Sequence, residues 1–430
     1  MGNDGGLASP TQNSGTPGEA PAVDLKWPEE GVARVPYKVF ADDDIFALEQ
    51  ERLFRGPVWH FLCFEHDVAN AGDFKTTWVG ETSVIVTRDE RGEIHAMENR
   101  CAHKGAIVCF KERGNTKTLS CVYHSWNYNL DGTLRGLAFS KGSRGAGGMG
   151  EDFDPANHRL QPLRTASHCG IVFGTFHEDT PSLAGYYGQP ALDYVEEALG
   201  RPYRLIGYHS QILHNNWKLY AENVRDPYHA TLLHTFYTTF KINRMDMEDG
   251  LVLSECGRHS YSYAKRRQLD EDSEYQRARV HSAQYDSRLA GPALLESFSE
   301  RAEGVSHSIQ SLFPALTIHF TLNSLAVRFF VPRNVEETEL HWYFLGFEDD
   351  TPEQSAIRSM HGNLMGAAGL VSLEDGCINE FVQRGTRGSR NARAFLEMGG
   401  TGVESTKGTR ATEAAIRGFW KGYRGVMGFE

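Results

Sequence analysis

Two short motifs that each pair a cysteine with a histidine constrain this chain more than any other feature. "ENRCAHKGA" covers residues 98–106, and "SCVYHSWNYNLDGTL" covers residues 120–134. The first motif contains Cys101 and His103, and the second contains Cys121 and His124. Thiolate and imidazole groups on two neighbouring loops are suitable ligands for a transition metal. The motifs therefore predict a metal site.

The ligand types alone leave two kinds of metal site open. A structural zinc site is one interpretation, but a zinc finger places its two cysteines together and its two histidines together. Here each motif supplies one cysteine and one histidine. That interleaving suits the Rieske arrangement, a two-iron cluster in which the cysteines hold one iron and the histidines hold the other.

Length, charge, hydrophobicity and cysteine spacing indicate a multidomain protein that binds neither nucleic acid nor membrane. A chain of 430 residues is longer than one ordinary domain. The formal net charge of −12 argues against a nucleic-acid partner, and no apolar run reaches the ~18–20 residues of a membrane span. The seven cysteines show no disulfide spacing, which favours a reducing cytoplasm.

Local patterns divide the chain into four parts. Residues 1–24, rich in Gly, Pro and Ser, predict a disordered tail without a secretory signal, and residues 25–56 predict a helical segment that packs on the C-terminal domain. Short alternating runs predict an all-β domain over 57–165 that contains both motifs, with a hairpin over 120–137 that turns at Asp131-Gly132. Residues 166–430 predict an antiparallel sheet flanked by helices, so the fold class is α+β. Helices are expected over 230–240 and 411–428, and long sheet strands over 315–332. No GxGxxG or GxxxxGK[ST] loop is present, so the chain itself is expected to bind neither nicotinamide nor flavin.

A second polar group lies in "NNWKLYAENVRDPYHATLLH", residues 215–234. His229 and His234 are five residues apart, about 140° around a regular helix. They can meet at one ion only if the helix ends or bulges between them. Asp226 followed by Pro227 indicates such a break, with Asp226 as the helix cap. On the residues alone, two ordinary buried histidines remain the alternative.

Taken together, "CAHKG", "CVYHSWNY" and the pattern EN-x2-D-x-YH-x4-H resemble the large (α) subunits of Rieske non-haem iron aromatic-ring-hydroxylating oxygenases. The resemblance implies a [2Fe–2S] cluster on Cys101, His103, Cys121 and His124. It implies a mononuclear Fe(II) on His229 and His234, with a third ligand in "GAAGLVSLEDGCINEFVQRG" (366–385). We expect this third ligand to be Asp375, with Glu374 as the alternative. Two histidines and one carboxylate are typical of non-haem Fe(II) oxygenases.

The same resemblance assigns Asp226 and Asn223 to the catalytic site. In the family, the aspartate that matches Asp226 connects the iron site to a cluster histidine of the neighbouring subunit. A helix-capping role for Asp226 is compatible with this one.

Within the family, "NNWKLY", "NSLAVR" and "ATEAAIRGFWKGYR" resemble the terephthalate dioxygenase and salicylate/anthranilate hydroxylase group. These enzymes act on aromatic carboxylates, which need a buried cation. Arg328 lies in an otherwise apolar strand, and a carboxylate is the best partner for a guanidinium there. Arg328 and Arg410 resemble the carboxylate-binding arginines of the terephthalate type, and Ser262 is a further candidate in the substrate site. An internal salt bridge is the alternative for either arginine.

The resemblance therefore implies the oxygenase component of a multicomponent ring-hydroxylating dioxygenase. The expected reaction is cis-dihydroxylation of terephthalate with O2 and NADH-derived electrons. Hydroxylation of salicylate or anthranilate is the alternative within the family, and a Rieske electron-transfer protein without oxygenase chemistry is the alternative from another class. The expected partners are a β subunit in an α3β3 assembly and a separate NADH-dependent reductase, with or without a ferredoxin. Neither nucleic acid nor membrane is expected.

Overall fold

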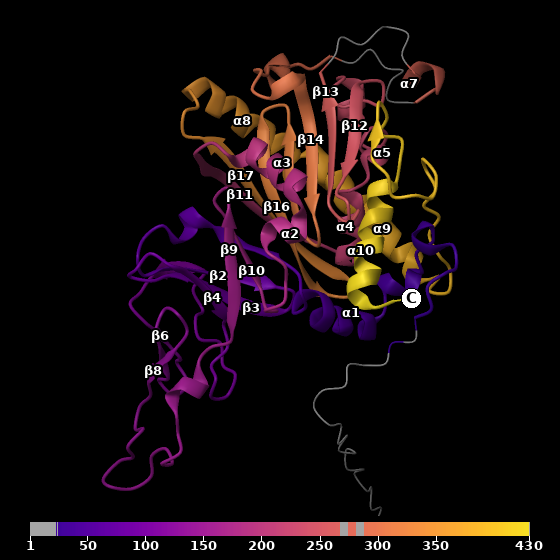
Figure 1. Cartoon of the computed structure of the whole chain (residues 1–430). Coiled ribbons are helices and arrows are strands. Elements are labelled where there is room, and N and C mark those ends of the chain that lie inside the picture. Colours follow the sequence, from indigo (N-terminus) through magenta and orange to yellow (C-terminus); the bar gives the residue numbers. More distant parts are fainter. Residues whose placement is uncertain (1–22, 24, 267–273, 281–287, 430) are drawn as a thin grey trace, which may run out of the picture.

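The computed structural model describes residues 23, 25–266, 274–280 and 288–429, and three antiparallel sheets organise them. Figure 1 shows a smaller, N-terminal part below a larger part that is built on the longest sheet. The predicted tail lies outside the described residues, apart from residue 23. The expected mixed α+β class is confirmed. None of the helices in the described residues combines the length and hydrophobicity that a membrane span requires.

A seven-stranded sheet forms the base of the N-terminal domain, in the order β1-β10-β9-β4-β3-β2-β5. Its strands are β1 (His60–Phe64), β2 (Asp73–Val79), β3 (Thr82–Arg88), β4 (Ile94–Glu98), β5 (Arg113–Asn115), β9 (Pro162–His168) and β10 (Ile171–Thr175). The hairpin of β9 and β10 returns from a long excursion and pairs with β4 and β1. The domain boundary expected after residue 165 therefore falls inside β9, and this sheet continues to Thr175.

A three-stranded sheet lies within that excursion: β6 (Leu119–Ser120), β7 (Asn127–Tyr128) and β8 (Leu134–Gly136). The Asp-Gly turn joins β7 to β8, as the sequence predicts. Asp131 accepts a hydrogen bond from the backbone N–H of Thr133, and Gly132 has a φ of 82°, which glycine adopts without steric cost. The Gly-rich segment 140–150 follows this sheet and precedes β9, so it is a loop of the N-terminal domain (Figure 1).

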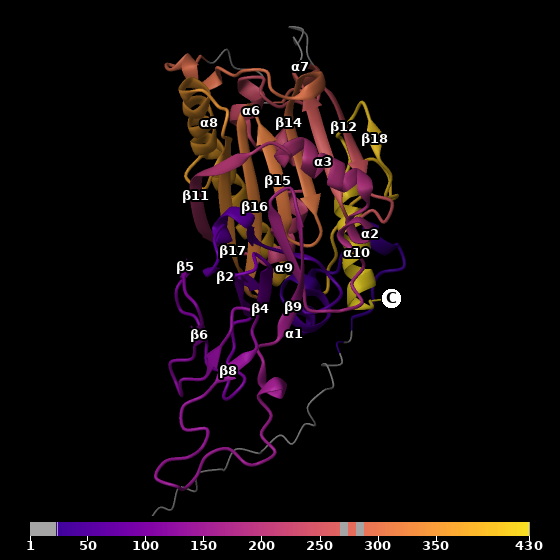
Figure 2. The same ribbon diagram turned by 60° about the vertical axis from the view of Figure 1, so that its left-hand side comes forward.

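An eight-stranded antiparallel sheet forms the C-terminal domain, in the order β11-β17-β16-β15-β14-β13-β12-β18. Its strands are β11 (Tyr203–Leu213), β12 (Glu248–Leu253), β13 (Ser260–Lys265), β14 (Val305–Leu312), β15 (Leu316–Thr321), β16 (Ser324–Asn334), β17 (Glu337–Phe347) and β18 (Thr406–Lys407). In Figure 2 the strands run side by side, with α8 (Pro352–Met365) at one edge and α10 (Ala414–Met427) at the other. Sheet strand is expected from the sequence over 315–332, and this run forms β15 and β16, both of which are buried.

The two faces of this sheet have different neighbours. The register places Ser262, His319, Ala326 and Arg328 on one face, which we call the inner face. Helix α4 (Trp217–Asn223) lies against the inner face, where Tyr220 contacts Arg328. The opposite face contacts α3 (Gln189–Leu199) and the N-terminal domain. The remaining described α-helices are α1 (Asp43–Glu49), α2 (Leu183–Tyr187), α5 (Pro227–Ala230), α6 (Thr235–Thr239), α7 (Glu274–Arg277) and α9 (Leu370–Arg387).

The N-terminal segment ties together two helices of the C-terminal domain, α4 and α10. Asp42 caps α1 by accepting hydrogen bonds from two backbone N–H groups, and a π-helical turn, Gln50–Phe54, continues the helix. Glu49 of α1 is fully buried between Lys218 of α4 and Tyr423 of α10, with Oε1 2.6 Å from Lys218 Nζ and 2.5 Å from the Tyr423 hydroxyl. This contact fixes the position of α4, whose C-terminal end carries Asn223.

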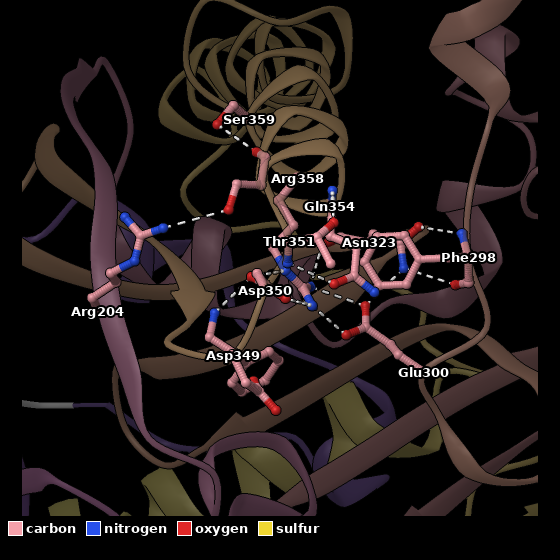
Figure 3. Close-up of polar contacts among 12 residues, drawn as sticks. Arg204, Phe298, Glu300, Asn323, Asp349, Asp350, Thr351, Gln354, Arg358 and Ser359 are labelled. Atoms are coloured by element: carbon pink, nitrogen blue, oxygen red, sulfur yellow. Dashed lines mark hydrogen bonds and ion pairs between the residues drawn. The ribbon is translucent and has the colours of Figure 1, made fainter.

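A buried ionic cluster anchors the turn between β15 and β16 (Figure 3). The guanidinium of Arg358 bonds Asp350 through Nε at 2.7 Å and Glu300 through Nη2 at 2.5 Å, and its Nη1 donates to the backbone oxygen of Asn323 at 2.9 Å. Asn323 is two residues beyond the end of β15, and Leu322 between them has a φ of 58°. The cluster therefore holds a strained turn directly after Thr321.

Candidate metal and substrate sites

The two Cys/His motifs form loops with the same backbone geometry. In the first loop the N–H of Cys101 bonds the oxygen of Ala106, and the N–H of Gly105 bonds the oxygen of Cys101. In the second loop the N–H of Cys121 bonds the oxygen of Trp126, and the N–H of Ser125 bonds the oxygen of Cys121. Gly105 and Ser125 both adopt positive φ, 74° and 55°. Each motif is thus a tight turn of the same form, with the histidine two residues after the cysteine in the first loop and three residues after it in the second.

The four candidate ligands divide into buried sulfurs and exposed imidazoles. Cys101 and Cys121 are each 2% exposed, whereas His103 and His124 lie at the surface with ring centroids 4.6 Å apart. The ring of His103 stacks on buried Trp126 at 5.0 Å. This donor set, two soft thiolates below two imidazoles, fits a Rieske cluster.

Tyr128 supports the sulfur side of this site. Its hydroxyl oxygen accepts a hydrogen bond from the N–H of Ala102 at 3.1 Å and lies 3.2 Å from the sulfur of Cys101. Burial raises the pKa of Tyr128, so the hydroxyl keeps its proton and can donate it to the sulfur. Hydrogen bonds to the sulfurs are one of the means by which a protein sets the potential of an iron–sulfur cluster.

The second polar group converges beneath the inner face. Helix α4 ends at Asn223, and the short helix α5 begins at Pro227. The chain leaves helical geometry again at His234, where φ is −77° and ψ is 84°. The predicted break is therefore present, although the helix expected over 230–240 is reduced to α6. His229 and His234 consequently face one another at a ring distance of 5.4 Å.

Asp375 of α9 completes a three-residue group with these histidines. Its Oδ1 lies 3.4 Å from His229 Nε2 and 3.3 Å from His234 Nε2. One ligand atom from each residue lies within 4.8 Å of the other two, an arrangement that can hold a metal ion. Two imidazoles and one carboxylate fit a mononuclear Fe(II).

Electrostatics also favours a cation at this point. Burial disfavours the charged imidazolium, but Asp226 and Asp375 outweigh burial and raise the pKa of His229 to about 10. Burial opposes ionisation of Asp375 as well, yet the two histidines hold its pKa well below the ordinary range. The carboxylates thus favour a positive charge at the point where the two imidazoles meet. A bound metal ion would supply that charge.

Three neighbouring side chains orient this group. Glu374 Oε2 lies 2.7 Å from His234 Nδ1, the ring nitrogen that faces away from Asp375. Asn223 contacts His229 Nε2 at 3.3 Å and donates to Asp375 Oδ1 at 3.1 Å. Asp226 caps α5 through the N–H groups of Tyr228 and His229, and its Oδ2 lies 3.4 Å from His229 Nδ1. Glu374 and Asp226 therefore contact the outer nitrogens of the two imidazoles.

A surface depression of about 460 Å³ opens outside the group. Asn223, Asp226 and His229 are among its polar lining residues. Its apolar lining consists of Leu219, Leu232, Leu233, Ile378, Val382, Leu396 and Ile416. Glu222 also lines it, and burial raises the pKa of Glu222 to about 8, so this carboxyl keeps its proton at neutral pH. A group from outside the chain would thus reach His229 by way of Asp226.

Arg328 lies on the inner face, and no carboxylate among the described residues forms an ion pair with it. Its side chain is 3% exposed and stacks over the ring of Trp342 at 4.7 Å. Nη1 donates to the hydroxyl of Tyr220 at 3.0 Å, while Nε and Nη2 have no hydrogen-bond partner within the part of the chain that the structure describes. A buried guanidinium with two unsatisfied nitrogens is a strong candidate for binding a carboxylate ligand.

Arg410 is placed differently. Its Nε bonds Asp249 Oδ2 at 2.8 Å with both side chains fully buried, and its Nη2 donates to the backbone oxygen of Arg244 at 3.0 Å. Nη1 alone has no hydrogen-bond partner among the described residues. The internal salt bridge considered from the sequence is therefore present. Ser262 lies on the inner face, opposite Leu251 and Ile309, and is 8% exposed.

Sequence reasoning missed three polar residues on the inner face. His307 of β14 and His319 of β15 are 2% and 4% exposed, and both contact Thr321. The ring of His307 lies 6.2 Å from Tyr237, which in turn lies 5.4 Å from His234. Two of them, on β15, could have been found from the sequence, because Thr317, His319 and Thr321 alternate along one strand. Such alternation predicts that the three side chains lie on the same face of the sheet.

The sequence matches two known families. Residues 58–142 match the family described as "Rieske [2Fe-2S] domain", and residues 195–428 match "Ring hydroxylating alpha subunit (catalytic domain)". The chain is 44% identical to a terephthalate 1,2-dioxygenase terminal oxygenase component subunit alpha 2 from Comamonas sp, over 94% of this chain and 98% of the relative. It is 41% identical to the anthranilate 1,2-dioxygenase large subunit of Burkholderia cepacia, with 95% and 96% covered. A salicylate 5-hydroxylase large oxygenase component from Ralstonia sp is 36% identical, with 94% and 97% covered.

Solved structures have the same fold. Naphthalene 1,2-dioxygenase from Rhodococcus sp., bound to indole, superposes with a TM-score of 0.74 at 23% identity and covers 92% of this chain and 94% of its own. At this identity the likeness concerns the arrangement of the domains and sheets.

Proposed function

Because the chain belongs to the ring-hydroxylating alpha-subunit family that carries a Rieske [2Fe–2S] domain, we propose that it is the oxygenase component of a multicomponent dioxygenase that acts on an aromatic carboxylate. A Rieske cluster and a mononuclear iron are the cofactors of this family, and the chain is a ring-hydroxylating dioxygenase subunit. The observation that carries the choice of a carboxylate is Arg328, a buried cation with two unsatisfied nitrogens.

The ligand assignments follow from the donor sets. Cys101, Cys121, His103 and His124 would hold the [2Fe–2S] cluster, and His229, His234 and Asp375 would hold the iron. When bound, the cluster relays electrons and the iron supplies the centre at which O2 is activated. Asn223 and Glu374 keep the side chains of the iron site oriented, and Arg328 would hold the substrate carboxylate from the sheet side.

Asp226 is proposed to connect the iron site with the cluster of a neighbouring copy. Its carboxylate contacts the outer nitrogen of His229 and lines the depression that opens to the surface. The imidazoles of His103 and His124 are also exposed, so a second chain can bring them to this depression. A carboxylate between two imidazoles fixes their tautomers and transmits charge.

The partners follow from the relatives, one of which is a terminal oxygenase component. We propose that a separate NADH-dependent reductase, with or without a ferredoxin, reduces the cluster, and that a β subunit completes an α3β3 assembly. A cytoplasmic location agrees with the seven cysteines, none of which is in a disulfide.

Terephthalate is the first candidate substrate. Both candidate arginines are deeply buried, at 3% and 0% exposure, and the terephthalate relative is 44% identical. The Arg410–Asp249 ion pair favours a second candidate, a monocarboxylate such as anthranilate or salicylate, because Asp249 already neutralises one cation.

Turnover and metal content test the proposal. The holoenzyme with an NADH-driven reductase should oxidise at least one of terephthalate, anthranilate, salicylate and benzoate, with product identified by mass spectrometry. About three irons and two acid-labile sulfides per chain are expected. Two irons per chain without turnover would instead fit an electron-transfer protein, and a zinc-loaded, colourless protein would contradict the cluster.

A further inference from the structure

Two buried histidines on the inner face share one hydroxyl group. His307 Nδ1 lies 2.8 Å from the hydroxyl of Thr321, and His319 Nε2 lies 2.7 Å from the same oxygen. The three side chains are 2%, 4% and 1% exposed, in the order His307, His319 and Thr321. Neither His307 Nε2 nor His319 Nδ1 makes a hydrogen bond to any residue that the structure describes. We call these three residues the relay.

The number of protons limits what the relay can offer to a ligand. Each neutral imidazole carries one N–H, and the threonine carries one O–H. Two of these three hydrogens are needed to make the two contacts to Thr321. At most one hydrogen is left for the outer nitrogens, so the neutral relay presents at most one donor there. The other outer nitrogen is then an acceptor.

The relay lies near both arginines. Burial holds the pKa values of His307 and His319 well below 6.5, so both rings are neutral in the free protein. In the sheet register, His307 pairs with Ala264, which pairs with Asp249, the partner of Arg410. His319 pairs with Ala326, two residues before Arg328 on the same face. The other titratable groups that face the relay are His234, Asp375 and Tyr237, and Asp249 faces Arg410. One end of the relay is therefore near each candidate carboxylate-binding group.

We propose that His307, Thr321 and His319 form a specificity-determining relay in the substrate site, which accepts one carboxylate together with one O–H or N–H donor and must gain a proton to accept two carboxylates. This proposal rests on the proposed function. A carboxylate at the Arg328 end requires a donor from His319. His307 is then an acceptor and suits a hydroxyl, amine or amide group of the substrate. A second carboxylate would meet an acceptor lone pair there unless one imidazole becomes protonated.

Terephthalate and its monoamide, 4-carbamoylbenzoate, are the matched probes. They have nearly the same shape, but only the monoamide presents an N–H donor at the second end. Titration calorimetry on anaerobic, oxidised holoenzyme, repeated in buffers of different ionisation enthalpy, counts the protons taken up on binding. We expect about one proton for terephthalate and about none for the monoamide. Because the imidazoles are neutral when free and protonated only in the complex, terephthalate affinity should fall up to about tenfold per pH unit between pH 6 and 8.

A threonine-to-valine change uncouples the two rings. In Thr321→Val each imidazole selects its tautomer independently, so both can donate without an added proton. Terephthalate should then bind with about no proton uptake and with a flat pH profile. Thr317→Val is the control, because Thr317 is a fully buried hydroxyl on the same strand and has no hydrogen-bond partner among the described residues. It should leave the proton count at about one.

The outcomes separate the two proposals. Equal proton uptake for both probes, or an uptake that Thr321→Val does not change, overturns the relay. If the enzyme still oxidises an aromatic carboxylate in that case, the proposed function stands. If neither probe binds and no aromatic carboxylate is oxidised, both proposals fail. A general loss of affinity for both probes in Thr321→Val, with the proton count unchanged, would make the relay merely structural.

Discussion

Asp226 combines two contacts in one carboxylate: Oδ1 caps α5, and Oδ2 lies against His229 Nδ1. Asn is also a good helix cap, so Asp226→Asn keeps α5 while it removes the charge. We expect both metal centres to remain occupied and electron transfer between them to slow by at least tenfold. Single-turnover oxidation of the reduced cluster, followed by its visible absorbance, measures this rate. An unchanged rate would limit Asp226 to capping.

The acidic pair of α9 allows a direct comparison of two neighbouring carboxylates. Asp375 lies against both imidazole nitrogens of the iron site, whereas Glu374 contacts only the outer nitrogen of His234. Asp375→Ala should lose the mononuclear iron and all turnover, and Glu374→Ala should keep the iron, with metal affinity lower by about 10–100-fold. Iron quantification on proteins with an intact cluster spectrum decides between them. If Glu374→Ala alone empties the site, the third ligand is misassigned by one residue.

The two candidate arginines differ in whether the protein itself supplies an anionic partner when no substrate is bound. Arg328 has no anionic partner within the described chain, and Arg410 keeps Asp249. Removing one partner of a buried charge pair costs about 2–5 kcal/mol, so Arg328→Ala should lower kcat/KM about 30-fold or more for every carboxylate substrate. Arg410→Ala should impair terephthalate severely and a monocarboxylate little. Steady-state kinetics on both substrates tests this, and equal losses would make Arg410 structural.

Which residues could be predicted from sequence depended on how they are brought together. The candidate cluster ligands occupy tight loops, so their short spacing carries the signal. His229 and His234 are separated by a break that Asp226-Pro227 makes visible. Asp375 was found through family resemblance alone, because α9 follows His234 by more than a hundred residues. Alternation along β15 places His319 and Thr321 on one face, but the approach of His307 to Thr321 and the Arg410–Asp249 pair depend on strand register across the large sheet, which no local pattern encodes.

At the scale of elements, the turn between β15 and β16 depends on Arg358. This residue is 1% exposed and is bonded to Asp350 and Glu300. Arg358→Met leaves two carboxylates buried without a cation and should lower the free energy of unfolding by about 3–5 kcal/mol. Arg201→Met removes the exposed neighbour of Asp349 and should cost about 0–1 kcal/mol. Urea denaturation of both variants measures the difference.

The same cluster predicts a pH dependence. Burial opposes ionisation of Asp350, but hydrogen bonds from Arg358 lower its pKa below that of an unfolded aspartate. A group with a depressed folded-state pKa stabilises the fold above its unfolded pKa, and the contribution is lost as the pH falls further. The stability difference between wild type and Arg358→Met should therefore shrink below about pH 4. An equal difference at pH 3 and pH 7 would contradict this assignment.

Element boundaries were the least predictable part of the fold. The long strands β15 and β16 and the closing helix α10 follow clear periodicity, so they were predicted. The helix expected over 230–240 contracts to α6 because His234 leaves helical geometry to face His229 and Asp375. The boundary expected after residue 165 falls inside β9, because the pairing of that strand with β4 joins residues some 65 positions apart.

At the scale of the whole molecule, the two candidate metal sites lie far apart in one chain. Strand β6 leads into the second cluster loop near the lower end of the molecule in Figure 1, whereas α5 lies beside the large sheet at its upper part. The His103 and His124 imidazoles are exposed, and Asp226 lines a depression open to the surface. This separation supports the proposal that electrons pass between chains rather than within one.

A chain with a damaged cluster can then use the cluster of its neighbour, so two inactive variants are expected to complement one another. His103→Ala damages the cluster and His229→Ala damages the iron site, so each homogeneous protein should be inactive. Co-expressed in equal amounts, the two alleles should complement: in a head-to-tail ring about one interface in four joins an intact cluster to an intact iron site. Activity of about a quarter of wild type is expected before the oligomers are fractionated, and about a third for mixed trimers that are purified through two different tags. Mixed oligomers without activity would show that electrons pass from cluster to iron within each chain, so that the two alleles cannot complement one another.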